Sequence, residues 1–164
     1  MKKFFKRFLI VLLIALVIIQ FFRPEKNKSD GPFPNDITTK YEVPAPVLEI
    51  LKVACYDCHS SNTHYPWYCE IQPVAWWMDG HIKDGKRNLN FSEFTSYRLR
   101  KQFNRFEGTA ELVKKDEMPL SSFTWMHKDA KLSAEQKQLI EDWSGRMQDS
   151  MRAHYPVDSL LKKK

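Results

Sequence analysis

The longest apolar stretch of the chain is residues 8–22, which follows a basic N-terminus that holds Lys2, Lys3, Lys6 and Arg7. As a helix, this stretch spans roughly 22 Å, and two preceding phenylalanines extend it toward the ~30 Å of a bilayer core. It continues into Gln20-Phe21-Phe22-Arg23-Pro24 without the small residues of a signal-peptide cleavage site. The pattern therefore predicts an uncleaved transmembrane signal anchor over residues 1–23, in preference to a cleaved signal peptide or a buried core helix.

The composition changes after this stretch. Residues 24–42 are rich in proline, asparagine and aspartate and show no periodic apolar signal, which predicts a flexible linker. Residues 43–158 hold enough apolar side chains for one folded domain, and residues 159–164 form a basic tail.

Within the folded part, apolar residues recur at helical spacing. Pro44 suits the first turn of a helix that runs to Cys55, and Pro73 suits the start of a second helix over 73–83.

Two further helix starts are indicated by possible capping boxes, Asn90 with Glu93 and Ser133 with Gln136. Gly108 is expected to interrupt the helix that follows Asn90, because glycine weakens a helix interior. No run shows the sustained alternation of a strand, so the sequence predicts an all-α fold.

The charge distribution argues against nucleic acid as a partner. The formal net charge is +6, but residues 1–28 alone hold seven Lys or Arg against one Glu, and three lysines end the chain. The stretch 29–161 holds 16 basic and 19 acidic residues. A nucleic-acid-binding domain carries its basic excess on the folded surface, so we expect no nucleic-acid partner.

The most specific chemistry lies in Cys55-Tyr56-Asp57-Cys58-His59. A C-x-x-C-H run is the attachment site of a c-type haem. The thiols of Cys55 and Cys58 add to the two vinyl groups on one porphyrin edge, and His59 supplies the proximal imidazole ligand of the iron. The sequence thus predicts one haem c per chain. Because this haem is attached outside the cytoplasm, the motif agrees with the predicted anchor.

Three other interpretations compete for these cysteines. A zinc site would combine Cys55 and Cys58 with two of His59, His64 and Cys69, but the chain has no second C-x-x-C. A thioredoxin-like dithiol needs a βαβ context that the helical pattern does not offer. A plain structural disulfide among the three cysteines is the remaining alternative.

Beyond the motif, the chain resembles the bacterial haem-binding domain family built on C-x-x-C-H. The resemblance covers about residues 43–147 and rests on these segments: Cys55-Tyr56-Asp57-Cys58-His59-Ser60, Tyr65-Pro66-Trp67-Tyr68, Ile71-Gln72-Pro73-Val74, Trp76-Trp77, His81, Gly85-Lys86-Arg87, Leu89-Asn90-Phe91-Ser92, Met118-Pro119-Leu120, Trp125-Met126-His127 and Leu132-Ser133. It implies a small, mostly helical, cytochrome c-like domain, membrane-tethered or exported, around one covalent haem. It implies no substrate.

The second axial ligand of the iron has several candidates. Met118 precedes a loop and a capped C-terminal helix, as the methionine ligand does in small c-type cytochromes, and a thioether ligand raises the reduction potential. His81 is the alternative and would give a bis-imidazole site. Four further side chains, or an open position, complete the set: His64, Met78, Met126 and His127.

Two groups of residues have simple structural interpretations. Aromatic side chains after the motif are expected in the core or against the haem: Tyr65, Trp67, Tyr68, Trp76 and Trp77. A basic group is expected on a solvated helix face, with pairing to haem propionates or to an acidic redox partner as alternatives: Arg98, Arg100, Lys101 and Arg105.

Together these features predict a membrane-anchored, single-pass protein whose haem domain faces the periplasm and exchanges single electrons with a redox partner protein. The alternative is a haem-based sensor or small-ligand binder with an open or displaceable sixth position. We expect no enzymatic activity, because a peroxidase needs a positioned acid/base group that the sequence does not indicate.

Overall fold

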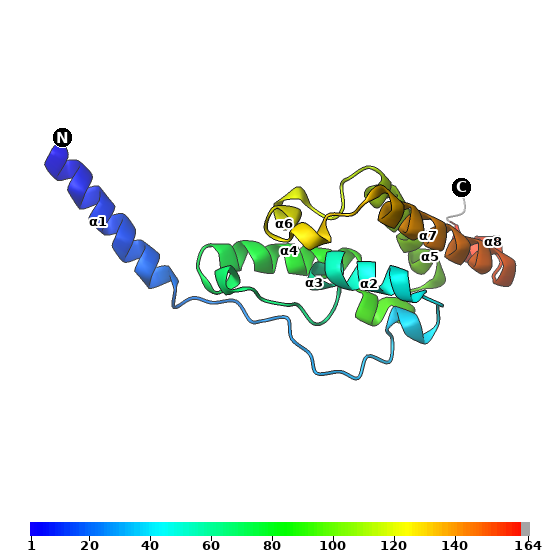
Figure 1. The fold of residues 1–164 in the computed structure, drawn as a ribbon. Coiled ribbons are helices and arrows are strands. Elements are labelled where there is room, and N and C mark those ends of the chain that lie inside the picture. The colour runs from blue at the N-terminus through cyan, green and yellow to red at the C-terminus, as the bar shows by residue number, and fades with distance from the viewer. Residues whose placement is uncertain (162–164) are drawn as a thin grey trace.

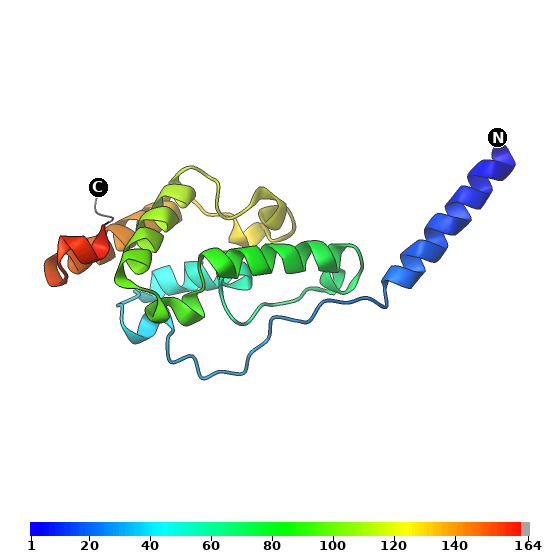
Figure 2. The ribbon, with the colours of Figure 1, turned by 180° about the vertical axis from the view of Figure 1, so that it is seen from behind.

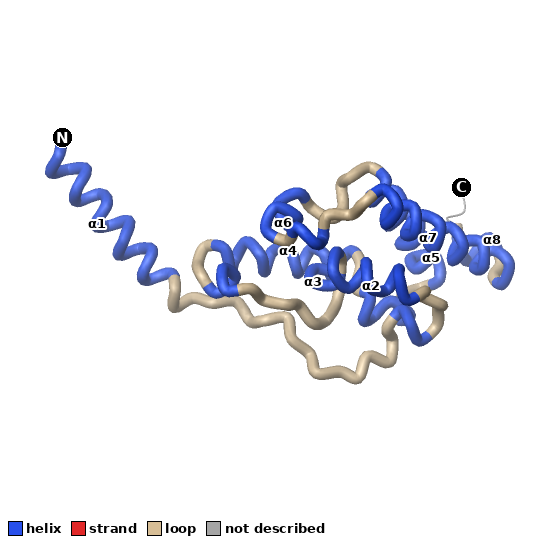
Figure 3. The backbone as a smooth tube through the Cα atoms, viewed as in Figure 1, coloured by secondary structure: helices blue, strands red, loops and turns tan. Residues whose placement is uncertain are grey.

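The computed structural model describes residues 1–161, and within that range all regular structure is helical (Figure 1; Figure 3). The α-helices are α1 (Lys2–Ile19), α2 (Ala45–Ala54), α3 (Tyr56–His59), α4 (Val74–Asn88), α5 (Leu99–Lys114), α6 (Ser121–Met126), α7 (Ala134–His154) and α8 (Val157–Leu160). The 3₁₀ helices are η1 (Ile37–Thr39), η2 (Trp67–Glu70), η3 (Phe91–Ser96) and η4 (Lys128–Ala130). The predicted all-α class is confirmed. Residues 162–164, half of the predicted basic tail, lie outside the described residues.

Helix α1 corrects the predicted transmembrane anchor. The helix ends at Ile19, before the apolar stretch does, and its first residues include all the basic side chains of the N-terminus. Its apolar part is therefore residues 8–19, which rise only about 18 Å against the ~30 Å of a bilayer core. Among residues 1–161, no helix combines the length and the apolar character needed to cross a membrane. The expected transmembrane helix over residues 1–23 is wrong.

The core forms where α5 and α7 pack side by side (Figure 2). Phe106 of α5 meets Trp143 of α7 edge to face with ring centroids 5.5 Å apart, and Tyr41 packs on Phe106 at 5.0 Å. Trp143 also donates its indole N–H to the carbonyl oxygen of Glu42 at 3.0 Å. Leu160, which the sequence places in the tail, is buried in the same cluster. Fully burying a phenylalanine side chain stabilises the folded state by roughly 1.5–3 kcal/mol. The cluster therefore fixes the position of α5 in the domain.

Helix boundaries follow the predicted caps with two differences. The capping box at Ser133 and Gln136 is present and begins α7. Asn90 accepts the N–H of Ser92, but it begins only the 3₁₀ helix η3. Gly108 does not interrupt α5, which runs on to Lys114 because its apolar side packs against α7.

The segment of residues 20–37 lies along the domain in both views, below α4 (Figure 1; Figure 2). Gln20 accepts the backbone N–H of Gln72 at 2.9 Å, and Gln72 donates its side-chain amide to the carbonyl oxygen of Phe22 at 2.8 Å. Farther along, the carbonyl oxygen of Asn27 accepts the backbone N–H of Thr63 at 2.9 Å.

The same segment fixes the loop that follows the C-x-x-C-H run. The side-chain amide of Asn27 donates to the carbonyl oxygen of Ser60 at 2.9 Å and to the hydroxyl of Thr63 at 2.8 Å. Its backbone N–H donates to the hydroxyl of Tyr65 at 2.7 Å. At the end of the segment, Ile37 is fully buried in the core. Residues 20–37 therefore contribute contacts to the domain although the sequence marks most of them as a linker.

Candidate functional site

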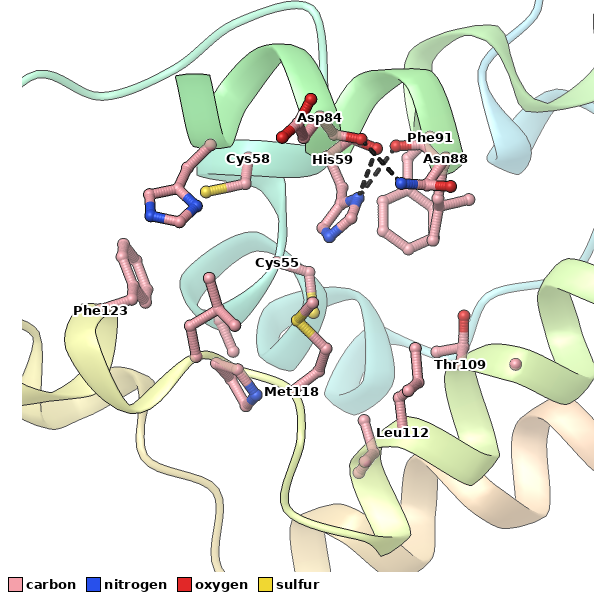
Figure 4. A pocket seen from close by; sticks show the side chains of 18 of the residues that line it. Cys55, Cys58, His59, Asp84, Asn88, Phe91, Thr109, Leu112, Met118 and Phe123 are labelled. Atoms are coloured by element: carbon pink, nitrogen blue, oxygen red, sulfur yellow. Dashed lines mark hydrogen bonds between the residues drawn. The ribbon is translucent and has the colours of Figure 1, made fainter. Parts of the chain in front are cut away.

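A cavity of about 510 Å³ opens between α2–α3, α4, α5 and the segment that carries Met118 (Figure 4). Its lining is mostly apolar and includes Cys55, Cys58 and His59. Pockets that hold cofactors and drug-sized ligands measure roughly 300–1,000 Å³ and are mostly apolar, so the cavity has the size and character of a cofactor site.

The two motif cysteines stand on one wall of this cavity. Cys55 follows the last residue of α2 and Cys58 lies in the single turn of α3, which brings both thiols to the same space. Both are free. Burial raises the pKa of Cys55 to about 12, with a further contribution from Cys58, and burial together with Asp57 raises the pKa of Cys58 to about 11. The cavity therefore holds two neutral thiols at neutral pH.

The zinc interpretation finds no complete ligand set in residues 1–161. Nowhere in that range do three or more His, Cys, Asp or Glu side chains come together as metal ligands. His64 is exposed, and its backbone N–H donates to the carboxylate of Asp57 at 2.9 Å. Cys69 is buried in η2 and lines a different, much smaller cavity against residues 23–26.

The imidazole of His59 is held in one orientation by backbone carbonyls. Its Nδ1–H donates to the carbonyl oxygens of Gly85 at 3.1 Å and Leu89 at 3.0 Å, at the C-terminal end of α4 (Figure 4). Because Nδ1 carries the proton, Nε2 keeps a free lone pair, which is the state that binds a metal. Burial lowers the pKa of His59 and the nearby Arg105 lowers it further, against the opposing effect of the two carbonyls. The side chain is thus a neutral imidazole in a fixed orientation.

Gly85 explains how α4 comes so close to the motif. A Cβ atom at this position would lie 2.5 Å from the carbonyl oxygen of Cys58, far inside van der Waals contact. Only a residue without a side chain lets the backbone of α4 meet that of α3 and place its carbonyl against His59. The glycine in the Gly85-Lys86-Arg87 segment therefore has a steric role in the site.

Met118 and His81 both line the cavity. Helix α5 ends at Lys114, and Asp116 follows in the left-handed region at φ 59°. The backbone N–H groups of Glu117 and Met118 both donate to the carbonyl oxygen of Leu112. This turn sends the Met118 side chain into the cavity across from His59 (Figure 4).

The other ligand candidates are placed differently. His81 stands on α4 with its ring edge-on to Trp77, with centroids 4.4 Å apart. His127 lies outside the main cavity and shares a hydrogen bond of 2.6 Å with the hydroxyl of Tyr68. Met78 and Met126 also line only a separate, small cavity. Of the candidates drawn from the sequence, the structure brings Met118 and His81 to the cavity that holds His59.

The sequence indicated Arg105 as an alternative partner of the haem propionates, but it did not predict that one face of α5 forms a wall of the cavity. Arg105, Gly108, Thr109 and Leu112 line the cavity at the i, i+3, i+4 and i+7 spacing of one helix face. Gly108 and Thr109 in that series are not large apolar residues, so the apolar periodicity of the sequence does not indicate this helix face. The expectation for the aromatic residues also needs correction, because Trp67 is 74% exposed and Trp77 is 48% exposed.

The fold and the site define a small helical protein with an apolar cofactor cavity, two thiols and an oriented imidazole. Residues 14–146 match the family described as haem-binding domain, which is more than half of the chain. The chain belongs to this family and is a haem-binding protein. The matched range includes the segment of residues 20–37, which forms hydrogen bonds to the domain. No curated protein and no solved structure gave a significant match.

Proposed function

We propose that the domain binds one haem covalently, through thioethers to Cys55 and Cys58, with His59 as the proximal iron ligand. The observation that carries the proposal is the state of His59 beside the two thiols. Its Nδ1–H is occupied by two carbonyl oxygens, so Nε2 is the nitrogen available to a metal. The two thiols are free and neutral; Cys55 lies one helical turn before His59, Cys58 lies directly before it, and both line the same cavity.

We propose one-electron transfer as the function of the bound cofactor. A haem iron supplies a one-electron couple between its ferric and ferrous states. Met118 supplies the sixth ligand in this proposal, because its side chain enters the cavity across from His59 and its thioether favours ferrous iron. The mostly apolar lining would limit the contact of a bound haem with water. Electron transfer also implies a redox partner protein.

Replacing Met118 with alanine is expected to lower the reduction potential and to open the ferrous iron to carbon monoxide. A methionine ligand gives the ferric protein a weak sulfur-to-iron charge-transfer band in the far red, and this band disappears in the variant. His81→Ala is the matched control, because His81 lines the same cavity; the control keeps the band and stays closed to carbon monoxide. Absorption spectra with and without carbon monoxide measure both effects.

The opposite spectral result would contradict the assignment of Met118 as the sixth ligand. If His81→Ala opens the iron and Met118→Ala leaves the spectra unchanged, His81 is the ligand. If the unmutated ferrous protein already binds carbon monoxide readily, the sixth position is open or displaceable. The function is then that of a sensor or small-ligand binder.

We also propose that the domain works outside the cytoplasm, because thioether attachment of haem takes place there. Protease added to intact spheroplasts of a producing bacterium should then digest the domain and remove its haem-stained band. A cytoplasmic marker enzyme serves as the control and stays protected. A domain that resists digestion until the cells are lysed contradicts this location.

A further inference from the structure

Arg105 is an unpaired cation in the wall of the haem cavity. It lies on α5 and lines the cavity together with Cys55, Cys58 and His59. Its Nε atom is buried and has no hydrogen-bond partner, and among the described residues its guanidinium forms no salt bridge. Other arginines of the chain do have acidic partners; Arg152, for instance, pairs with Asp149 at 2.9 Å.

Arg105 as a whole is half-buried, but its buried Nε–H is costly, because burial removes water from this donor without supplying another partner. The acidic residue that lines this cavity, Asp84, is already paired with Arg87 at 2.5 Å. Among residues 1–161, no side chain accepts a hydrogen bond from this charged donor. A ligand that carries an anionic group would supply the acceptor.

The position of Arg105 selects which part of a haem it meets. Arg105 lies one helical turn before Thr109 on the same face of α5. Figure 4 shows Thr109 and Cys58 on opposite sides of the space between His59 and Met118. In a haem, the two carboxylate-bearing side chains project from the edge opposite the two vinyl groups. If the cysteines hold the vinyl edge, the carboxylates point toward the side of α5.

We propose that Arg105 binds a propionate carboxylate of the haem. This inference rests on the proposed attachment at Cys55 and Cys58. The guanidinium presents several N–H donors in a plane that matches a carboxylate, so one such pair orients the porphyrin and supplies the acceptor that the buried Nε–H lacks. Arg105 and His59 line the same cavity, which agrees with this placement. The site thus requires a porphyrin with free carboxylates.

The test compares two porphyrins on the full-length apoprotein: mesohaem, whose ethyl groups cannot form thioethers, and its dimethyl ester, which lacks the carboxylate charges. Arg105→Met is expected to weaken mesohaem binding about 10- to 100-fold, the usual loss for a hydrogen bond to a charged group. The same change should alter binding of the ester by less than about threefold. Arg98→Met is the matched control, because Arg98 begins the same helix, is exposed and does not line the cavity. The control changes neither affinity.

Stability of the apoprotein separates recognition from a structural role. Removing a half-buried guanidinium whose Nε–H has no partner should leave the melting temperature of the apoprotein unchanged or raised. Equal weakening of both porphyrins by Arg105→Met, or no weakening of either, overturns the proposal, as does an unmutated protein that binds both porphyrins equally. If Arg105→Met does not fold, Arg105→Lys is measured instead. Its affinity for mesohaem is then expected to fall by less than about 10-fold, and its affinity for the dimethyl ester is expected to fall less than that. Haem staining of the unmutated holoprotein is independent of these titrations and reports separately on covalent attachment.

Discussion

Alanine at both Cys55 and Cys58 is expected to abolish accumulation of holoprotein. The two thiols share one cavity wall, and each forms one of the two proposed bonds to the porphyrin edge. Without them only His59 and the apolar lining hold the cofactor, and denaturation releases it. Haem staining of a denaturing gel, after production in cells that attach c-type haem, should show no stained band for the double variant. Each single variant should keep a weaker band through its remaining thioether.

Cys69→Ala is the control for this experiment. Cys69 is also free and buried, but it lies in η2 and faces another cavity. The control variant should stain like the unmutated chain. A double variant that stains as strongly as the unmutated protein would contradict thioether attachment at these two positions.

The second large effect is expected from Gly85→Ala. The new methyl group would lie 2.5 Å from the carbonyl oxygen of Cys58, so the backbones of α3 and α4 must separate. Overpacking of this kind destabilises by roughly 1–3 kcal/mol. The separation also removes a carbonyl from Nδ1 of His59, so we expect weaker haem binding in addition to the lower stability. Denaturant unfolding of the apoprotein and the yield of haem-stained protein measure the two effects.

Gly80→Ala is matched to this change, because Gly80 lies in the same helix and has nothing within 4 Å of an added Cβ atom. Alanine there should raise the stability by about 0.5–1 kcal/mol, the usual preference of a helix interior. The close-approach argument fails if Gly85→Ala behaves like Gly80→Ala in both measurements.

Much of the chemistry of the site could be predicted, because its central residues are neighbours in the sequence. Cys55, Cys58 and His59 lie within one helical turn, so their proximity needs no tertiary contact. The capping box at Ser133 is equally local and was predicted correctly. Met118 could be identified as a candidate, but its entry into the cavity depends on the turn after α5.

The rest of the site depends on contacts between distant segments. The carbonyl oxygen of Gly85 that orients His59 comes from a different helix, and no local pattern reveals such a partner. Gly108 costs about 1 kcal/mol in an isolated helix, but packing of α5 on α7 overrides that preference. Arg105 belongs to a sequence typical of a solvated helix face, and only the structure shows its Nε buried and unpaired.

The position of α1 shows the same limit of local patterns. An apolar stretch is visible in the sequence, but the residue at which the helix ends is not. The chain leaves the helical conformation after Ile19, and Gln20 then contacts Gln72 of the domain. That contact, made across 52 positions of the chain, could not be predicted from the stretch itself.

Covalent attachment of haem to the C-x-x-C-H run is the central claim, and mass spectrometry tests it most directly. Holoprotein is extracted with acid-acetone, weighed intact, digested and mapped by peptide. We predict a mass that exceeds that of the chain by one haem, and a single haem-bearing peptide that contains Cys55 and Cys58. An extracted protein with the mass of the bare chain, or haem on a peptide without these cysteines, would contradict the claim.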